Sequence, residues 1–145
     1  MAAILIDIAD AIALQLNVAD LSQVFTAARK YLPPTELEDT ADVVVQVVPR
    51  GWSITRVSRA SYQNAYKVDI GIQKRVGLAN AALDAMLLLT EEIAQWFRGL
   101  ILANDSGVRL GTVTEVLVDP IYASEHLDQL NQWTSIVRLT VVGFN

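Results

Sequence analysis

The side chains most often used in catalysis are sparse and badly placed in this sequence. His126 is the only histidine and cysteine is absent, so neither a histidine-rich metal site nor a thiolate nucleophile can be assembled. A serine nucleophile would need His126 as its base, yet no G-x-S-x-G motif is present. We therefore expect His126 to lie in a surface loop.

The acidic residues do not form a catalytic pair either. Glu91 and Glu92 are adjacent in a predicted helix and project about 100° apart, which keeps them from converging on one substrate. The acidic segment Thr35–Asp42 lacks the spacing of a calcium-binding EF-hand, and we interpret it as a solvated loop. The glycines match no phosphate-binding motif. The sequence thus predicts no enzyme and no cofactor or metal site.

Basic residues concentrate in the middle of the chain. Residues 29–75 hold eight of the eleven Lys and Arg residues against five acids, whereas residues 76–145 hold eight acids against three bases. Basic and aromatic side chains interleave there: Arg50, Trp52, Arg56, Arg59, Tyr62, Tyr66, Lys67, Lys74 and Arg75. This pattern is superficially that of a nucleic-acid platform, but a net charge of -5 argues against a dedicated nucleic-acid binder. Complementary surfaces on neighbouring subunits and ordinary solvated strand faces are the other interpretations.

The composition is that of a single globular domain, residues 1–145. At 52% hydrophobic and 19% charged residues, the chain is apolar enough to predict an exposed patch reserved for another subunit. The absence of cysteine fits a reducing compartment. The apolar start lacks a basic region and contains Asp7 and Asp10, so we expect no signal peptide. Four charged residues interrupt Leu78–Leu102, which favours a buried helix over a membrane span.

The stretch Tyr66–Arg75 predicts the central strand of the fold. Its apolar residues alternate with polar ones, so one face should meet the core and the other water or a partner. Further strands are predicted at Val24–Leu32, Ala41–Pro49, Trp52–Ser61, Leu110–Asp119 and Trp133–Phe144. We expect a turn at Arg50–Gly51 and a bulge between Ile54 and Val57.

Two helices are predicted from apolar spacing. The first has Ile4, Ile8, Ile12 and Leu16 on one stripe, with Asn17 as its stop. The second, Leu78–Leu102, carries a broad core stripe: Ala82, Leu83, Met86, Leu87, Leu88, Leu89, Ile93, Trp96, Phe97 and Leu100. The predicted fold is therefore α+β, with a mixed, mostly antiparallel β-sheet flanked by an N-terminal amphipathic helix and a long central helix.

The order of these parts resembles a family of tailed-bacteriophage proteins, the tail terminator or tail-completion proteins of the neck. The resemblance rests on ARKYLP (28–33), VVVQVVP (43–49), VDIGIQKRV (68–76), LLLTEEI (87–93) and WTSIVRLTV (133–141). It implies a structural virion protein that is assembled in the host cytoplasm. It also implies a ring, usually hexameric, that caps the tail tube and joins it to the head-closure or connector ring. The family has no active site to transfer.

The charge distribution predicts which residues would contact a neighbouring subunit. The candidates are Arg50, Arg56, Arg59, Lys67, Asp69, Gln73, Lys74 and Arg75, facing the acidic second half of the next copy. The expected partners are copies of this chain, the tail-tube protein and the head-closure protein, with passive contact to DNA in a channel and no membrane. The alternatives are a head-closure, adaptor or tail-tube protein, a nucleic-acid-binding module, and a small hydrolase with an unrecognised site.

Overall fold

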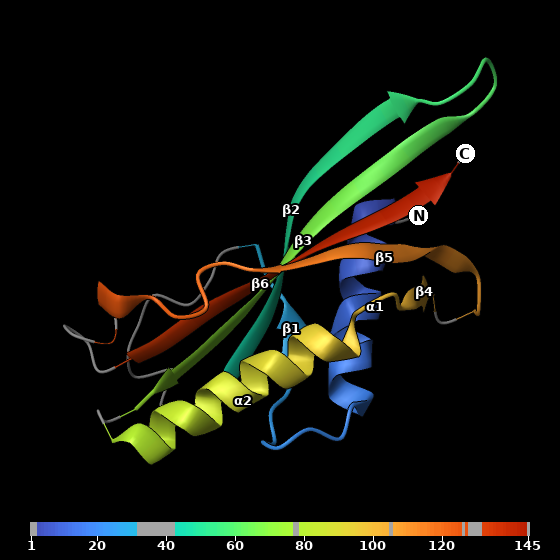
Figure 1. The fold of residues 1–145 in the computed structure, drawn as a ribbon. Helices are drawn as coiled ribbons and strands as arrows, with labels where there is room; N and C mark the ends of the chain where they lie inside the picture. The colour runs from blue at the N-terminus through green and yellow to red at the C-terminus, as the bar shows by residue number, and fades with distance from the viewer. Residues whose placement is uncertain are drawn as a thin grey trace.

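The computed structural model describes residues 3–31, 43–76, 79–104, 106–125, 127 and 132–144. Figure 1 shows its elements in chain order: α1 (Ile4–Val18), β1 (Ala27–Arg29), β2 (Val44–Arg56), β3 (Tyr62–Arg75), α2 (Asn80–Trp96), β4 (Ile101–Ala103), β5 (Arg109–Val118) and β6 (Gln132–Phe144). The strands form one sheet in the order β1-β2-β3-β6-β5-β4. β1 pairs with β2 in parallel, and the other neighbours pair antiparallel. The predicted α+β class with a mixed sheet is confirmed.

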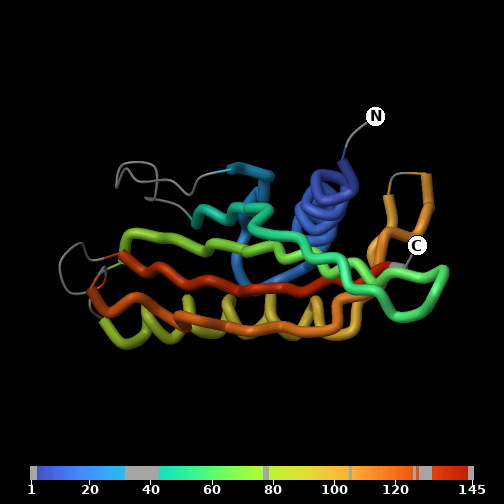
Figure 2. The backbone as a smooth tube through the Cα atoms, turned by 90° about the horizontal axis from the view of Figure 1, so that it is seen from above, coloured from blue at the N-terminus to red at the C-terminus, as the bar shows by residue number. Residues whose placement is uncertain are grey.

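The sheet curls around its helices instead of lying flat. α1 contacts β1 and β2 near one edge of the sheet and β4 and β5 near the other, whereas α2 packs along β5 and β6. Figure 2 shows α2 running beside β5, with α1 standing across the strand direction. The helices therefore share one side of the sheet and leave the opposite side without a helix.

The core lies between the two helices and one face of the sheet. On β3 the predicted alternation is confirmed, because Tyr66, Val68, Ile70 and Ile72 are all buried. Their neighbours on β6, Val137, Leu139 and Val141, lie on the same face through the register Ile70↔Val137. Each Ile- or Leu-sized side chain removed from water contributes roughly 1.5–3 kcal/mol, so this layer holds the domain together.

The first helix matches three of the four residues of its predicted stripe. Ile8, Ile12 and Leu16 are buried, whereas Ile4, the first residue of the helix, is 47% exposed. The helix ends at Val18, one residue after the predicted stop. The Asn17 side chain accepts from the Ala27 backbone N–H at 2.7 Å and donates to the Ala27 carbonyl at 3.0 Å. The residue predicted to end the helix therefore also joins the helix end to β1.

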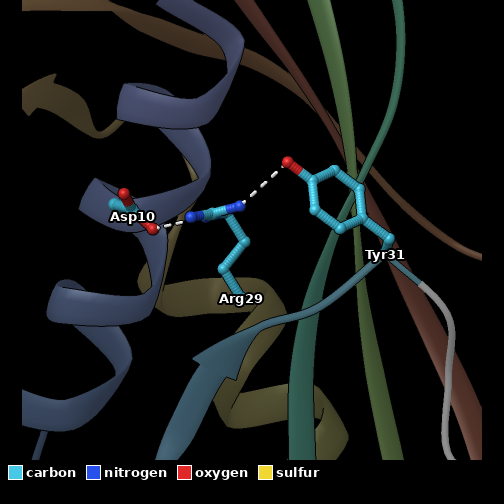
Figure 3. Close-up of polar contacts among 3 residues, drawn as sticks. All are labelled: Asp10, Arg29 and Tyr31. Carbon is cyan, nitrogen blue, oxygen red and sulfur yellow. Dashed lines mark hydrogen bonds and ion pairs between the residues drawn. The ribbon is translucent and has the colours of Figure 1, made fainter. Parts of the chain in front are cut away.

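A polar cluster provides a second tie between the edge strand β1 and α1. The Nε of Arg29 lies 2.7 Å from a carboxylate oxygen of Asp10, and its Nη1 donates to the Tyr31 hydroxyl at 3.2 Å. Figure 3 shows the guanidinium between the helix and the end of β1. The hydrogen bond and charge of Asp10 raise the pKa of Arg29. This basic residue is thus used inside the subunit.

The first departure from prediction lies in β2. We expected a turn at Arg50–Gly51, but the strand runs on to Arg56, and the register shift between Pro49 and Gly51 absorbs the proline. A bulge accommodates proline because proline has no backbone N–H to donate to the neighbouring strand. The predicted bulge between Ile54 and Val57 is also wrong, since pairing is regular up to Arg56↔Tyr62. The hairpin turns at residues 57–61, where the Val57 and Ser58 N–H groups donate to the Ser61 carbonyl.

The second departure concerns the long helix. It spans Asn80–Trp96, whereas Ile101 and Leu102, predicted as helical, belong to β4 (Ile101–Ala103). Gly99 adopts a φ of 71°, a conformation that glycine tolerates and that turns the chain out of the helix. Met86, Leu89, Ile93 and Phe97 are buried as expected. By contrast, three apolar residues assigned to the core stripe are 38–49% exposed: Leu87, Leu88 and Trp96.

The remaining predictions are met in part. The strand expected over Val24–Leu32 is reduced to β1, and Val24 is almost fully exposed. The last two predicted strands agree with β5 and β6 to within a residue. The acidic segment Thr35–Asp42 and His126 lie outside the described residues.

Candidate assembly surface

The eight predicted contact residues do not gather into one patch. Arg56 and Arg59 lie at the hairpin turn between β2 and β3, whereas Lys74 and Arg75 lie at the far end of β3. β3 has 14 residues, and a strand rises by roughly 3.3 Å per residue, so its ends are about 43 Å apart. The other four lie between these ends. The basic stretch is therefore a line along the hairpin, with different surroundings at each point.

One face of the sheet carries no helix, and we call it the uncovered face. It consists of the alternate residues of the central strands that point away from the core: Val44, Gln46, Val48, Lys67, Asp69, Gly71, Gln73, Arg75, Ile136, Arg138 and Thr140. Arg50, at the bulge, joins them, because its Nε lies 2.8 Å from a carboxylate oxygen of Asp69. These two predicted contact residues are thus paired inside the subunit, which partly neutralises both charges.

Two predicted contact residues are placed differently from expectation. Lys74 continues the series of core residues on β3, two positions after Ile72, and sits opposite the buried Trp133, so it lies on the helix side and not on the outward face. Gln73 does lie on the uncovered face but is only 7% exposed. It lies between its register partners Val44 and Thr134 on the two flanking strands, because β3 is central in the sheet. Lys67 and Arg75 remain exposed there.

The uncovered face holds several polar atoms without a partner. Gln46 Oε1, Gln73 Oε1 and Arg138 Nε are buried and make no hydrogen bond to the described residues. A buried polar group left unsatisfied costs about 1–3 kcal/mol. This face is therefore a tight polar layer that does not present these groups freely to solvent.

The β2–β3 hairpin extends beyond the helices as an arm, residues 52–66 (Figure 1). Its helix-side face exposes Trp52, Ile54 and Tyr62 by 57%, 55% and 41%. The Trp52 ring stacks on Tyr66 with centroids 5.9 Å apart, and its Nε1 donates to Asn64 Oδ1 at 3.1 Å. The base of the arm is therefore braced, whereas its outer part presents apolar side chains to water.

The tip of the arm is basic. The Nε of Arg56 donates to the Ser58 carbonyl at 3.1 Å and its Nη2 donates to the Arg59 carbonyl at 3.2 Å. Residues 52–66 contain these two arginines and no acid. The arm therefore combines an apolar face with a positive end.

The side of α2 turned away from the sheet has the opposite character. Asp84, Leu87, Leu88, Glu91 and Gln95 are all exposed and recur at helical spacing, and we call them the outer face of α2. The helix contains three acids and no base. Glu92 is occupied, because its carboxylate accepts from the Ser22 hydroxyl and from the Ser22 N–H at 3.2 Å. Asp84 and Glu91 form no ion pair among the described residues.

Within the described ranges, no three His, Cys, Asp or Glu residues come together as a metal site. A hollow of about 640 Å³ lies between the start of β5 and the end of β6, and among the described residues that line it only Arg109 is titratable. The Nη2 of Arg109 donates to the Thr112 hydroxyl. None of the described helices combines the length and apolar character needed to cross a bilayer.

The aromatic and basic residues that suggested a nucleic-acid platform are separated by the fold. Tyr66 is buried beneath Trp52, and burial raises the pKa of its phenol. Lys67 and Arg50 lie on the uncovered face, whereas Trp52 and Tyr62 lie on the helix side. A row of nucleic-acid bases could not stack on side chains that are divided between the two faces of one hairpin.

Comparison with known proteins identifies a fold relative. No family model and no curated protein sequence matches the chain. Among solved structures, a chain from the virion of the native gene transfer agent (GTA) particle superposes with a TM-score of 0.61 at 14% identity. The match covers 99% of this chain and 100% of that chain. The likeness in fold therefore extends over nearly the whole length of both chains.

Sequence reasoning missed the two exposed apolar surfaces. The sequence pattern assigned the residues of the arm to an ordinary strand face and Leu87 and Leu88 to the core. Apolar periodicity identifies an apolar face but does not show whether another element packs on that face. The surplus of apolar residues predicted that an exposed patch exists, but it did not indicate where the patch lies.

Proposed function

We propose that the protein is a structural component of a virion, a ring-forming subunit of the tail terminator type. In this role it would cap the tail tube and join it to the head–tail connector. The observation that carries the proposal is the likeness in fold, over the whole length of both chains, to a component of a gene transfer agent virion. The sequence resemblance to neck and tail proteins points to the same class.

A ring subunit needs two different surfaces that meet head to tail. The arm and the outer face of α2 supply an apolar, basic surface and an apolar, acidic surface on one chain. The partners in this proposal are further copies of the chain, in a ring of six, together with the tail-tube protein and the head-closure protein. DNA would pass through the channel with passive contact only.

A head-closure, adaptor or tail-tube protein is the second candidate, because the same likeness in fold supports any structural subunit of this region. Binding separates them. A tail terminator binds the end of assembled tail tubes and the closure ring, whereas a tube protein polymerises with itself into long tubes.

Light scattering coupled to size-exclusion chromatography, followed by negative-stain imaging, tests the proposal. We expect a discrete ring whose mass corresponds to six chains, formed alone or on adding tail tubes. A chain that stays monomeric in both conditions would contradict the role. Strong, salt-sensitive DNA binding at micromolar protein would favour a nucleic-acid-binding module instead.

A further inference from the structure

The inference concerns the contact that closes the ring, and it rests on the proposed function. Two surfaces of the described chain have exposed apolar side chains next to charges without an ion-pair partner. The first is the arm, with Trp52, Ile54 and Tyr62 on one face and two arginines near its tip. The second is the outer face of α2, with Leu87 and Leu88 flanked by Asp84 and Glu91.

The two surfaces match in chemistry. Each presents large apolar side chains that are 38–57% exposed. Monomeric soluble proteins rarely leave sizeable apolar patches exposed to water. The arm has positive charge only, and α2 has negative charge only. Opposite charges around an apolar centre give an interface its register and exclude the like-charged pairings, arm with arm or helix with helix.

The two surfaces also lie in separate parts of the molecule. Figures 1 and 2 both place the hairpin tip at one end and the N-terminal half of α2 at the other. The arm cannot fold back onto the helix of its own chain, because the stacking of Trp52 on Tyr66 and the continuous ladder to β3 hold it outward. A contact between unlike surfaces in separate parts of the molecule repeats from copy to copy and closes a ring when the rotation permits.

We propose that the arm of one subunit packs on the outer face of α2 of the next subunit. The helix-side face of the arm, around Ile54, meets Leu87 and Leu88. The tip arginines, Arg56 and Arg59, approach Asp84 and Glu91. The occupant of each surface is thus a second copy of this chain.

Cross-linking tests the contact directly, because the chain has no cysteine of its own. Ile54→Cys and Leu88→Cys replace exposed side chains, so both variants should fold. An equimolar mixture of the two, treated with a short bismaleimide, should give a covalent pair and nothing larger. The double variant should give a ladder ending at the ring size. Neither single variant alone should cross-link.

A matched control uses Val108→Cys, an exposed apolar position outside both surfaces. Its mixture with Ile54→Cys should stay uncross-linked. Discrete rings in light scattering without a 54–88 cross-link would overturn the inference while leaving the proposed function in place. Cross-linking of Ile54→Cys with itself would overturn it in favour of an arm-to-arm contact. A chain that remains monomeric at every concentration, with and without tail tubes, would overturn both.

Charge exchange provides an independent test of the same contact. The double change Arg56→Glu with Arg59→Glu should weaken assembly at least tenfold, as should Asp84→Lys with Glu91→Lys. Mixing these two variants should restore assembly, because the two chains can alternate around a ring of six and every contact then joins opposite charges. Combining all four changes in one chain should restore assembly as well. Lys67→Glu with Arg75→Glu makes the same change in charge on the uncovered face and should leave assembly within twofold. Assembly lost equally in this control would overturn the assignment to the arm.

Discussion

The two halves of the β2–β3 hairpin follow the same ladder but end in different surroundings. In the inner half, Val47 and Ile70 are paired across the strands and completely buried. In the arm, Trp52 and Ile54 occupy the same face of the same strand and are more than half exposed. The difference arises from coverage alone, because the helices lie beneath the inner half only. A regular apolar face is therefore a core face or a contact face depending on what reaches it.

The largest expected effect is the contrast between Ile70→Ala and Ile54→Ala. Emptying the buried site should lower the free energy of unfolding by about 2–5 kcal/mol. The exposed site should change it by less than about 0.5 kcal/mol. Urea unfolding followed by circular dichroism, at concentrations where the chain is monomeric, measures both. Equal losses would show that the arm is packed within the subunit.

The next effect concerns the base of the arm, where Trp52 braces the hairpin. Trp52→Ala removes the stacking on Tyr66 and leaves the buried Asn64 amide without this donor, which should cost about 1–3 kcal/mol. Trp52→Phe keeps a ring and should cost roughly half as much by the same principles. The same unfolding experiment checks the order. A smaller loss for alanine than for phenylalanine would refute the bracing role.

A smaller effect is expected on the uncovered face of the inner half, where Arg50 and Asp69 form an exposed ion pair. A double-mutant cycle with Arg50→Ala and Asp69→Asn should give a coupling below about 1 kcal/mol, because solvent screens the pair. Added salt should reduce the coupling further. Coupling that persists in high salt would mean that this face is shielded from solvent.

The smallest effect concerns Tyr66, at the boundary between the two halves. Burial raises the pKa of its phenol above the ordinary value of 10.0, so the folded state favours the neutral form. This contribution to stability is complete below pH 10 and is lost as the pH rises through the folded pKa. The melting temperature of Tyr66→Phe should therefore fall less steeply with pH above 10 than that of the unaltered chain. Parallel pH profiles of melting temperature would contradict burial of the phenol.

Much of the inner half was predictable from the sequence. The period of two in Tyr66–Ile72 and the period of four in Ile4–Leu16 identified buried faces, except at the exposed Ile4, because strand and helix geometry place those residues on one side. Predictions failed where local signals compete. Arg50–Gly51 has turn chemistry but continues as a strand, since pairing with β3 is worth more than the turn. The helix pattern ran past Gly99 because apolar residues of β4 happen to continue it.

The predicted contact residues likewise include some that the structure places on an exposed apolar surface and others that it does not. Charge alone selected them, and charge does not report the strand face or the partner. Arg50 and Asp69 neutralise each other, Gln73 is buried and Lys74 points to the helix side. Only Arg56 and Arg59 lie on the surface that the structure marks by exposed apolar side chains. The apolar residues beside them carried the missing information, but they had been assigned to the fold.

The sequence by itself determined the class of fold and most of the faces of its strands and helices. These follow from local periodicity and from residue types. Only the tertiary structure decided which apolar faces are covered, because coverage depends on where α1 and α2 end. The β2–β3 hairpin is longer than the part of it that the helices cover. That mismatch in length leaves the arm exposed, whereas the outer face of α2 is exposed because it is turned away from the sheet. These two uncovered surfaces are the physical basis of the proposed ring contact.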